Sequence, residues 1–183
     1  MTKGKLNRTG LLSLVFLVAF SLTGVAQSKK KVAEIREDAK VAKQEFLKAD
    51  WKMEKLFGEA YGYVIFPNVG KGAVGIGGAS GNGVAYEQGA EIGMAKLTQL
   101  SIGFQWGGQA YREVVFFENK AAMDNFKGNN IELAAQVSAV AVTAGASADA
   151  KYKDGVMVFT MQKGGLMYEA SVGGQKFKFD PFE

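Results

Sequence analysis

The sequence predicts an α+β protein. An N-terminal amphipathic helix, or a pair of helices, precedes a glycine-rich antiparallel β-barrel or sandwich that contains one short helix. Two observations predict this class. Between residues 29 and 57, apolar residues recur at alternating spacings of three and four, which is a helical period. From Tyr61 onward, short apolar or alternating runs are broken by glycine, which indicates strands.

The first 26 residues have the pattern of a secretory signal peptide. The first ten residues contain three basic residues and no acidic residue and lead into the apolar run LLSLVFLVAFSL. The small residues Gly24 and Ala26 stand before the expected cleavage site. About 12 apolar residues are too few for a membrane-spanning helix, which needs about 20. We expect a mature chain that begins near Gln27 and is exported to the periplasm or the outer cell envelope.

The mature chain is almost neutral. The signal contains three of the 22 basic residues and none of the 18 acidic residues, which leaves a net charge of +1. A near-neutral exported chain is a poor candidate for nucleic-acid binding, because a nucleic-acid binder keeps a strong basic excess on one face. We expect a helical segment at residues 27–59 to pack with a β-rich part at residues 60–183 as one domain.

The helical segment carries one apolar stripe and many lysines. The stripe consists of Val32, Ile35, Ala39, Ala42, Phe46, Ala49, Met53 and Leu56. Because Asp50 is a suitable cap for a second helix starting at Trp51, the segment forms either one helix or two that break near Ala49. Such a basic amphipathic segment either lies on an anionic bilayer or packs on its own domain. The narrow, alanine-rich stripe favours packing.

The rest of the mature chain is predicted to be mostly strands. One short helix is expected between an N-cap at Asn119 and a stop at Gly128. Turns are indicated by SGNG at residues 80–83, by Asp154–Gly155 and by KGG at residues 163–165. The candidate strands are YGYVIF, GAVGIGGAS, GVAYE, EIGMAKL, LSIGFQWGG, AYREVVFFE, IELAAQVSAV, GVMVFTMQ, LMYEASVGG and QKFKFD.

A G-x-G-x-x-G pattern occurs at Gly70, Gly72 and Gly75, but nothing else supports a nucleotide-binding loop. In a dinucleotide fold the glycine turn opens a helix, whereas here IGGASGNG follows, and each glycine costs a helix about 1 kcal/mol relative to alanine. A phosphate-binding Walker loop fails as well, because Lys71 is followed by glycine instead of Ser or Thr. We expect strand glycines such as Gly75 and Gly77 to serve curvature and close approach.

The composition excludes most catalytic chemistry. The chain has neither histidine nor cysteine, so it lacks the commonest general base, thiol nucleophiles and the usual zinc ligands. No enzyme, cofactor or metal site is predicted. Trp106, Tyr111 and Arg112 could form a binding rim, but a core position and an ion pair are the favoured roles.

Three blocks in order carry a family resemblance: AYGYVIFPNVGKGAVGIGGASGNGVAY, GFQWGGQAYREVVFFENKAAMDNF and MQKGGLMYEASVGGQKF. From about Ala60 to Phe177 the chain resembles the SYLF domain family, whose members bind membrane lipids. Some eukaryotic members bind phosphoinositides and actin, but neither partner is expected for an exported chain of this kind. The resemblance implies a non-catalytic phospholipid-binding module and places Lys71 on the basic position of the family's K-x-G block.

We therefore expect an exported protein that associates with anionic membrane surfaces through a basic face formed by Lys29, Lys30, Lys31 and Lys71. Two alternatives stay open at this point. One is a carrier that encloses a lipid or another hydrophobic molecule inside the barrel. The other is a structural or protein-interaction module of the cell envelope.

Overall fold

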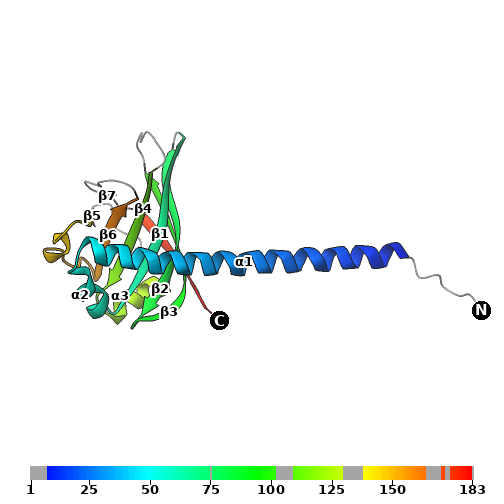
Figure 1. Ribbon diagram of the computed structural model, residues 1–183, viewed down its shortest axis with the longest axis horizontal. Helices are drawn as coiled ribbons and strands as arrows, with labels where there is room; N and C mark the ends of the chain where they lie inside the picture. Colours follow the sequence, from blue (N-terminus) through cyan, green and yellow to red (C-terminus); the bar gives the residue numbers. More distant parts are fainter. Residues whose placement is uncertain are drawn as a thin grey trace, which may run out of the picture. The chain divides into compact units, whose positions relative to one another are not determined.

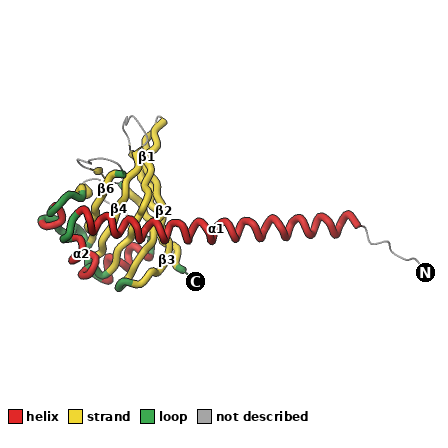
Figure 2. The backbone as a smooth tube through the Cα atoms, in the orientation of Figure 1, coloured by secondary structure: helices red, strands yellow, loops and turns green. Residues whose placement is uncertain are grey.

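The computed structural model describes residues 8–74, 76–101, 109–129, 138–163, 170–171 and 174–182 (Figure 1, Figure 2). The helices in these ranges are α1 (Arg8–Ala49), α2 (Met53–Glu59), α3 (Lys120–Lys127) and the short 3₁₀ helix η1 (Ala146–Ala148). The strands are β1 (Gly62–Val74), β2 (Ile76–Glu87), β3 (Ala90–Ser101), β4 (Gln109–Phe117), β5 (Ser138–Ala141), β6 (Val156–Gln162), β7 (Ala170–Ser171) and β8 (Gln175–Pro181).

The chain divides into two compact units, Met1–Glu34 and Ile35–Glu183. The first unit contains the part of α1 that ends at Glu34. The second unit contains the rest of α1 and every other described element, so the helical segment from Ile35 onward belongs to the same compact body as the sheet.

The strands of the described ranges form an eight-stranded sheet in the order β7-β5-β6-β4-β1-β2-β3-β8. The α+β class is thus confirmed. The sheet is not closed, because β7 and β8 stand at opposite ends of this order and no pairing of described residues joins them. The expectation of a fully antiparallel sheet was wrong in one place, since β5 pairs with β6 in parallel.

Helices α1 and α2 cover one face of the sheet. Ala39, Ala42 and Phe46 of the apolar stripe are fully buried, and so is Met53. They belong to a cluster with sheet residues Tyr63, Ile65, Val84, Tyr86, Val114, Phe116, Met157 and Phe159. Of the two roles considered for the stripe, packing on its own domain is therefore the one that the structure confirms from Ile35 onward.

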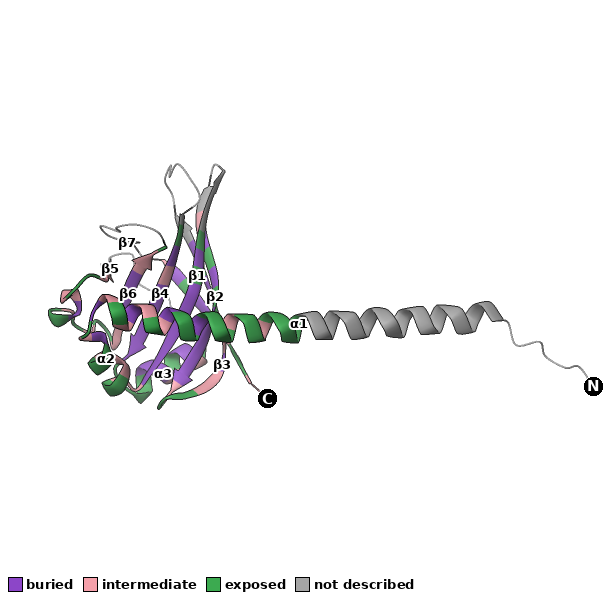
Figure 3. Ribbon diagram, viewed as in Figure 1, coloured by how far each residue is buried: buried purple, intermediate pink, exposed green. Residues whose placement is uncertain are grey.

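Helix α3 packs on the opposite face, which curls around it. Phe126 of α3 stacks on Phe117 at a centroid distance of 5.0 Å and also contacts Phe177 of β8 at 6.4 Å. Phe177 in turn contacts Phe66 of β1, although β1 and β8 are not neighbours in the sheet. Figure 3 shows that burial concentrates on the strands between the two helical layers.

Of the two alternatives left open for the helical segment, the structure has two helices, although the second begins at Met53 with Lys52 as its N-cap and not at Trp51 with Asp50 as its cap. Helix α1 ends at Ala49, and α2 begins at Met53. Asp50 organises the junction, because its Oδ1 accepts a hydrogen bond from the Lys52 amide at 3.0 Å and its carbonyl oxygen accepts one from Met53 N at 3.0 Å. An aspartate that bonds the amide two residues ahead is a common way to start a turn.

Two details of the first hairpin differ from the prediction. SGNG at residues 80–83 is not a turn but the middle of β2, paired with both β1 and β3. Pro67 does not end the first strand, because β1 continues to Val74 with an irregular register between Ile65 and Asn68. A bulge tolerates proline since its residues do not need a regular ladder hydrogen bond.

Gly70 and Gly72 of the G-x-G-x-x-G pattern therefore lie in a strand, and β2 follows at Ile76 where a dinucleotide fold would have a helix. Gly75 lies outside the described residues. The rejection of a dinucleotide-binding loop is supported, because a strand has no helix N-terminus to hold a pyrophosphate.

Close approach explains two glycines of β2. A Cβ atom on Gly81 would lie 2.8 Å from the Asn68 carbonyl oxygen, and one on Gly83 would clash with the Ile65 carbonyl oxygen and the Phe66 ring. The steric reason expected for strand glycines is thus found here. The surroundings that a Cβ atom on Gly77 would meet lie outside the described part.

The prediction of GAVGIGGAS as one strand was wrong, because β1 ends at Val74 and β2 begins at Ile76 within it. Three other local predictions for the β-rich part are confirmed. Asn119 caps α3, because its side chain accepts a hydrogen bond from Ala122 N at 3.0 Å. Gly128 ends the helix, and the left-handed residue is the next one, Asn129. Asp154 and Gly155 both have positive φ, as a tight hairpin turn requires. The predicted KGG turn extends beyond Lys163 into residues outside the described ranges.

Candidate functional site

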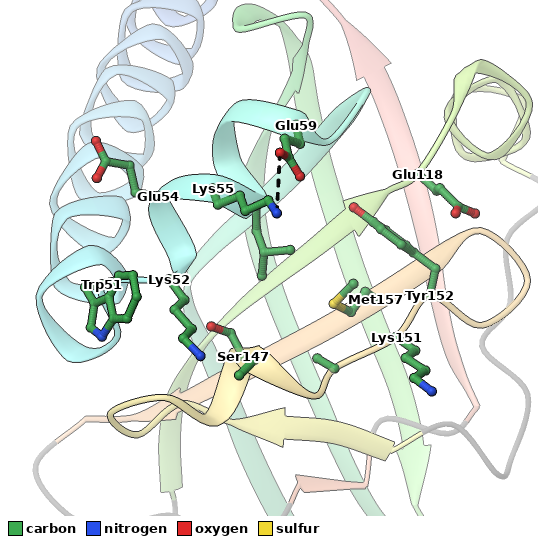
Figure 4. A pocket seen from close by; sticks show the side chains of 13 residues that line it. Trp51, Lys52, Glu54, Lys55, Glu59, Glu118, Ser147, Lys151, Tyr152 and Met157 are labelled. Atoms are coloured by element: carbon green, nitrogen blue, oxygen red, sulfur yellow. Dashed lines mark ion pairs between the residues drawn. The ribbon is translucent and has the colours of Figure 1, made fainter.

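A groove lies between α2, the segment around η1 and strand β6 (Figure 4). Its volume is about 960 Å³. Leu56, Met157 and Ala150 supply apolar lining, and these three also pack against the core cluster under α1 and α2. The groove thus has a fixed apolar floor that is part of the domain core.

Trp51 lines this groove and is 72% exposed. It occupies the corner between α1 and α2, and Lys52 Nζ lies 5.5 Å from the centroid of its ring. Lys48 and Lys55 on the flanking helices are exposed as well. An exposed tryptophan ring with a lysine ammonium group close to it is a combination that occurs at membrane–water interfaces.

Asp50 holds this corner against the opposite wall of the groove. The carboxylate is 1% exposed and accepts hydrogen bonds from Ser147 N at 2.9 Å and from Ser147 Oγ at 2.7 Å. Burial acts to raise the pKa of Asp50, but the hydrogen bonds from Ser147 and Lys52 outweigh it, so the pKa lies below its usual value of 3.8. The carboxylate is therefore charged when it joins η1 to the α1–α2 corner.

The ionic groups of the groove are balanced. Three lysines and three glutamates line it, namely Lys52, Lys55, Lys151, Glu54, Glu59 and Glu118. Lys55 and Glu59 lie 3.8 Å apart, as the dashed line in Figure 4 marks. Tyr152 is half-buried, and desolvation together with the charges of Glu118 and Glu59 raises its pKa to about 12. The groove offers both signs of charge around an apolar floor, with Tyr152 as a neutral phenol.

The residues predicted to form a basic face are not brought together by the described contacts. Lys29, Lys30 and Lys31 are exposed on α1, and Lys30 lies 3.9 Å from Glu34. They belong to the first compact unit, whereas Lys71 belongs to the second. Lys71 pairs with Ala79 and Gln109 in the sheet, but its side chain lies outside the described part. The predicted face stays a prediction.

The favoured roles for Tyr111 and Arg112 are confirmed. Tyr111 is 1% exposed in the core, and Arg112 forms an ion pair of 2.6 Å with Glu45 of α1. Trp106 lies outside the described residues. Burial, and next the charge of Glu113, raises the pKa of Tyr111.

A buried polar cluster beside Tyr111 was missed by sequence reasoning. Glu113 is fully buried on β4, and its carboxylate accepts a hydrogen bond of 2.9 Å from Gln175 of β8. Gln99 and Thr160 are also buried. Because β4 and β8 lie four places apart in the strand order, this bond crosses the interior of the curled sheet. The polar residues interrupt otherwise apolar strands, and that interruption was the available signal.

The groove itself was also missed. Its visible signal is the sequence ADWKMEK at residues 49–55, where a tryptophan lies among lysines at a predicted helical break. The opposite wall comes from a segment about one hundred residues later, which no local pattern connects with Trp51.

The described residues contain no group of three or more acidic side chains arranged to hold a metal ion. In the same part of the chain, none of the helices combines the length and apolar character that crossing a membrane requires.

Comparison with known proteins gives two similarities. Residues 98–181 match the model of a family described as Ysc84, Las17-binding protein actin regulator. The chain is also 32% identical over 127 residues to Beta cell expansion factor A of Aeromonas veronii. That alignment covers 68% of this chain and 48% of the relative, so the chain spans about half the length of the relative that it matches. The family match includes β8 and α3 but not Lys71.

Proposed function

We propose, since this chain belongs to the SYLF (Ysc84) family, that it is an exported, non-catalytic protein that binds phospholipid at a membrane surface. The observation that carries the proposal is the exposed Trp51 beside the groove of α2, η1 and β6. The ring enters the headgroup region, and the neighbouring lysines face lipid phosphates.

The charges that line the groove determine which lipid headgroups we expect it to bind. Lysines attract the phosphate of a headgroup, while Glu54 and Glu118 suit the ammonium group of a zwitterionic lipid. Contact at the groove should therefore depend only moderately on salt. A basic face formed by Lys29 to Lys31 and Lys71 would add a separate, strongly screened attraction to anionic lipid.

Binding at the surface is better supported than enclosure inside the sheet. The apolar half of the interior is filled by Phe66, Phe117, Phe126 and Phe177, whose ring centroids lie between 5.0 and 6.4 Å apart in successive contacts. An acyl chain would have to displace these rings.

The fluorescence of Trp51 tests the proposal. Trp106→Phe leaves Trp51 as the single tryptophan of the mature chain. Titration with phosphatidylcholine vesicles, with and without phosphatidylglycerol, should move the Trp51 emission to shorter wavelength as the ring leaves water. Trp51→Ala should weaken the affinity for vesicles, measured by sedimentation, about ten- to a hundredfold, because burial of a large side chain contributes about 1.5 to 3 kcal/mol.

Val41→Ala is the matched control, since Val41 is an exposed apolar residue on α1 away from the groove lining. An unchanged Trp51 emission at saturating lipid would contradict the proposed contact. Exchange of all four basic-face lysines for Gln separately tests that face: sedimentation with anionic vesicles at low salt should fall, while circular dichroism should not change.

A further inference from the structure

We propose that the exposed surface of β3 and β8 binds a phosphate-rich polyanion through two lysines, here named the lysine ladder: Lys96 and Lys178. Lys96 of β3 is the direct cross-strand partner of Lys178 of β8. Both lysines are exposed.

The pairing of Lys96 with Lys178 is unfavourable for the sheet alone. Residues directly opposite in an antiparallel pair have Cβ atoms about 5 Å apart, and like charges in these positions are destabilising. Neither Lys96 nor Lys178 forms an ion pair with any residue of the described ranges. A negatively charged ligand between the two ammonium groups would remove their repulsion, so the register creates a ready site for an anion.

The surroundings of the ladder are polar and uncovered. On this face α1 packs against Val84 and Met94, but further along the same strands Asn82 and Thr98 are exposed. Asn82 is the β2 partner of Lys96, so an amide group lies next to the ladder. Asp180, two residues beyond Lys178, limits the basic region toward the end of β8.

This chemistry favours a hydrophilic polyanion over a bilayer. The large hydrophobic side chains that are exposed in the described part, Val41 and Trp51, both lie outside the ladder, which therefore offers nothing to insert between lipids. Lysine binds phosphate as a point charge. Two such charges on side chains whose Cβ atoms lie about 5 Å apart across the strands suit a ligand with closely spaced phosphates.

Calorimetric titration of the mature protein with tripolyphosphate at low salt tests the site. Lys96→Gln and Lys178→Gln should each weaken binding about fivefold, as expected for loss of one charge contact at about 4 Å in water, and the double variant about thirtyfold. Lys153→Gln is the matched control, because Lys153 is an exposed lysine in the turn before β6, and it should bind as the parent does.

Lys178→Glu distinguishes loss of the binding site from loss of the fold, since it replaces a like-charge pair by an ion pair with Lys96. This variant should unfold at a higher temperature than the parent and yet lose tripolyphosphate binding, so the loss cannot come from misfolding. Equal affinity of the parent and the Lys96, Lys178 double variant would overturn the proposal. A second pair of results would also overturn the proposal: the parent does not bind tripolyphosphate, and the double variant no longer sediments with vesicles. The lysine ladder would then be a membrane-binding site. The Trp51 emission shift is independent of both results.

Discussion

Asp50→Ala tests how the groove is held together. The substitution removes hydrogen bonds of 2.7 and 2.9 Å to Ser147 and one of 3.0 Å to the Lys52 amide. A hydrogen bond to a charged group contributes about 1.5 to 3 kcal/mol, but bonds that share one carboxylate are not additive. We expect a loss of about 3 kcal/mol in the free energy of unfolding, which corresponds to a decrease of about 6 to 12 °C in the melting temperature.

The stability that Asp50 contributes should decrease as the pH is lowered. Because the folded-state pKa of Asp50 is lower than its usual value of 3.8, the carboxylate stabilises the fold fully above that value. This contribution is lost as the pH falls through the folded-state pKa. The difference in stability between the parent and Asp50→Asn should therefore be largest near neutral pH and decrease below about pH 3.8.

Urea unfolding followed by circular dichroism measures these differences. Asp149→Ala is the control, because Asp149 is an exposed acid two residues from Ser147 and should change stability by less than about 0.5 kcal/mol. If Asp50→Ala unfolds within that margin of the parent, the carboxylate does not anchor η1 and our account of the groove is wrong.

Three further predictions concern the core and the N-terminus. Gly83→Val should lower the free energy of unfolding by about 1 to 3 kcal/mol or prevent folding, whereas Gly70→Val, at an exposed strand position with open space around it, should be tolerated in the same thermal melt. Gln175→Leu should cost about 2 kcal/mol by removing the donor to buried Glu113, and a stability equal to that of the parent in urea would contradict this role. N-terminal sequencing of protein from fractionated cells should find a start near Gln27, and an intact N-terminus in the membrane fraction would refute the predicted signal peptide.

Local patterns were sufficient for much of the fold. The spacing of Ala39, Ala42 and Phe46 predicted the buried side of α1, and Asp50 marked the break before α2, because both signals arise from neighbours on one helix. Similarly, the cap at Asn119 depends on contacts only three residues apart. The family resemblance was confirmed by a match that covers residues 98–181.

The same local patterns could not predict contacts between residues far apart in the sequence. SGNG has the composition of a turn, but it pairs with both β1 and β3, and the close approach of β1 requires glycine at residues 81 and 83, so tertiary contact overrides the local preference. The parallel pairing of β5 with β6 has no sequence signal of its own. The groove combines Asp50 with Ser147, residues separated by most of the domain, and could not be predicted from either segment.

The two helical layers have a consequence for motion. Residues 63–66 of β1 and 114–117 of β4 are covered on both faces, so their amide hydrogens should exchange with solvent only when the whole domain unfolds. The α1–α2 corner lies at the edge of this body, and in the described ranges the hydrogen bonds of Asp50 join it to η1. We expect these bonds to open at a lower free energy than the sheet. Opening of the corner and unfolding of the sheet are then separate events, and Asp50→Ala, which lowers the stability of the whole domain, should favour the opening of the corner by itself as well.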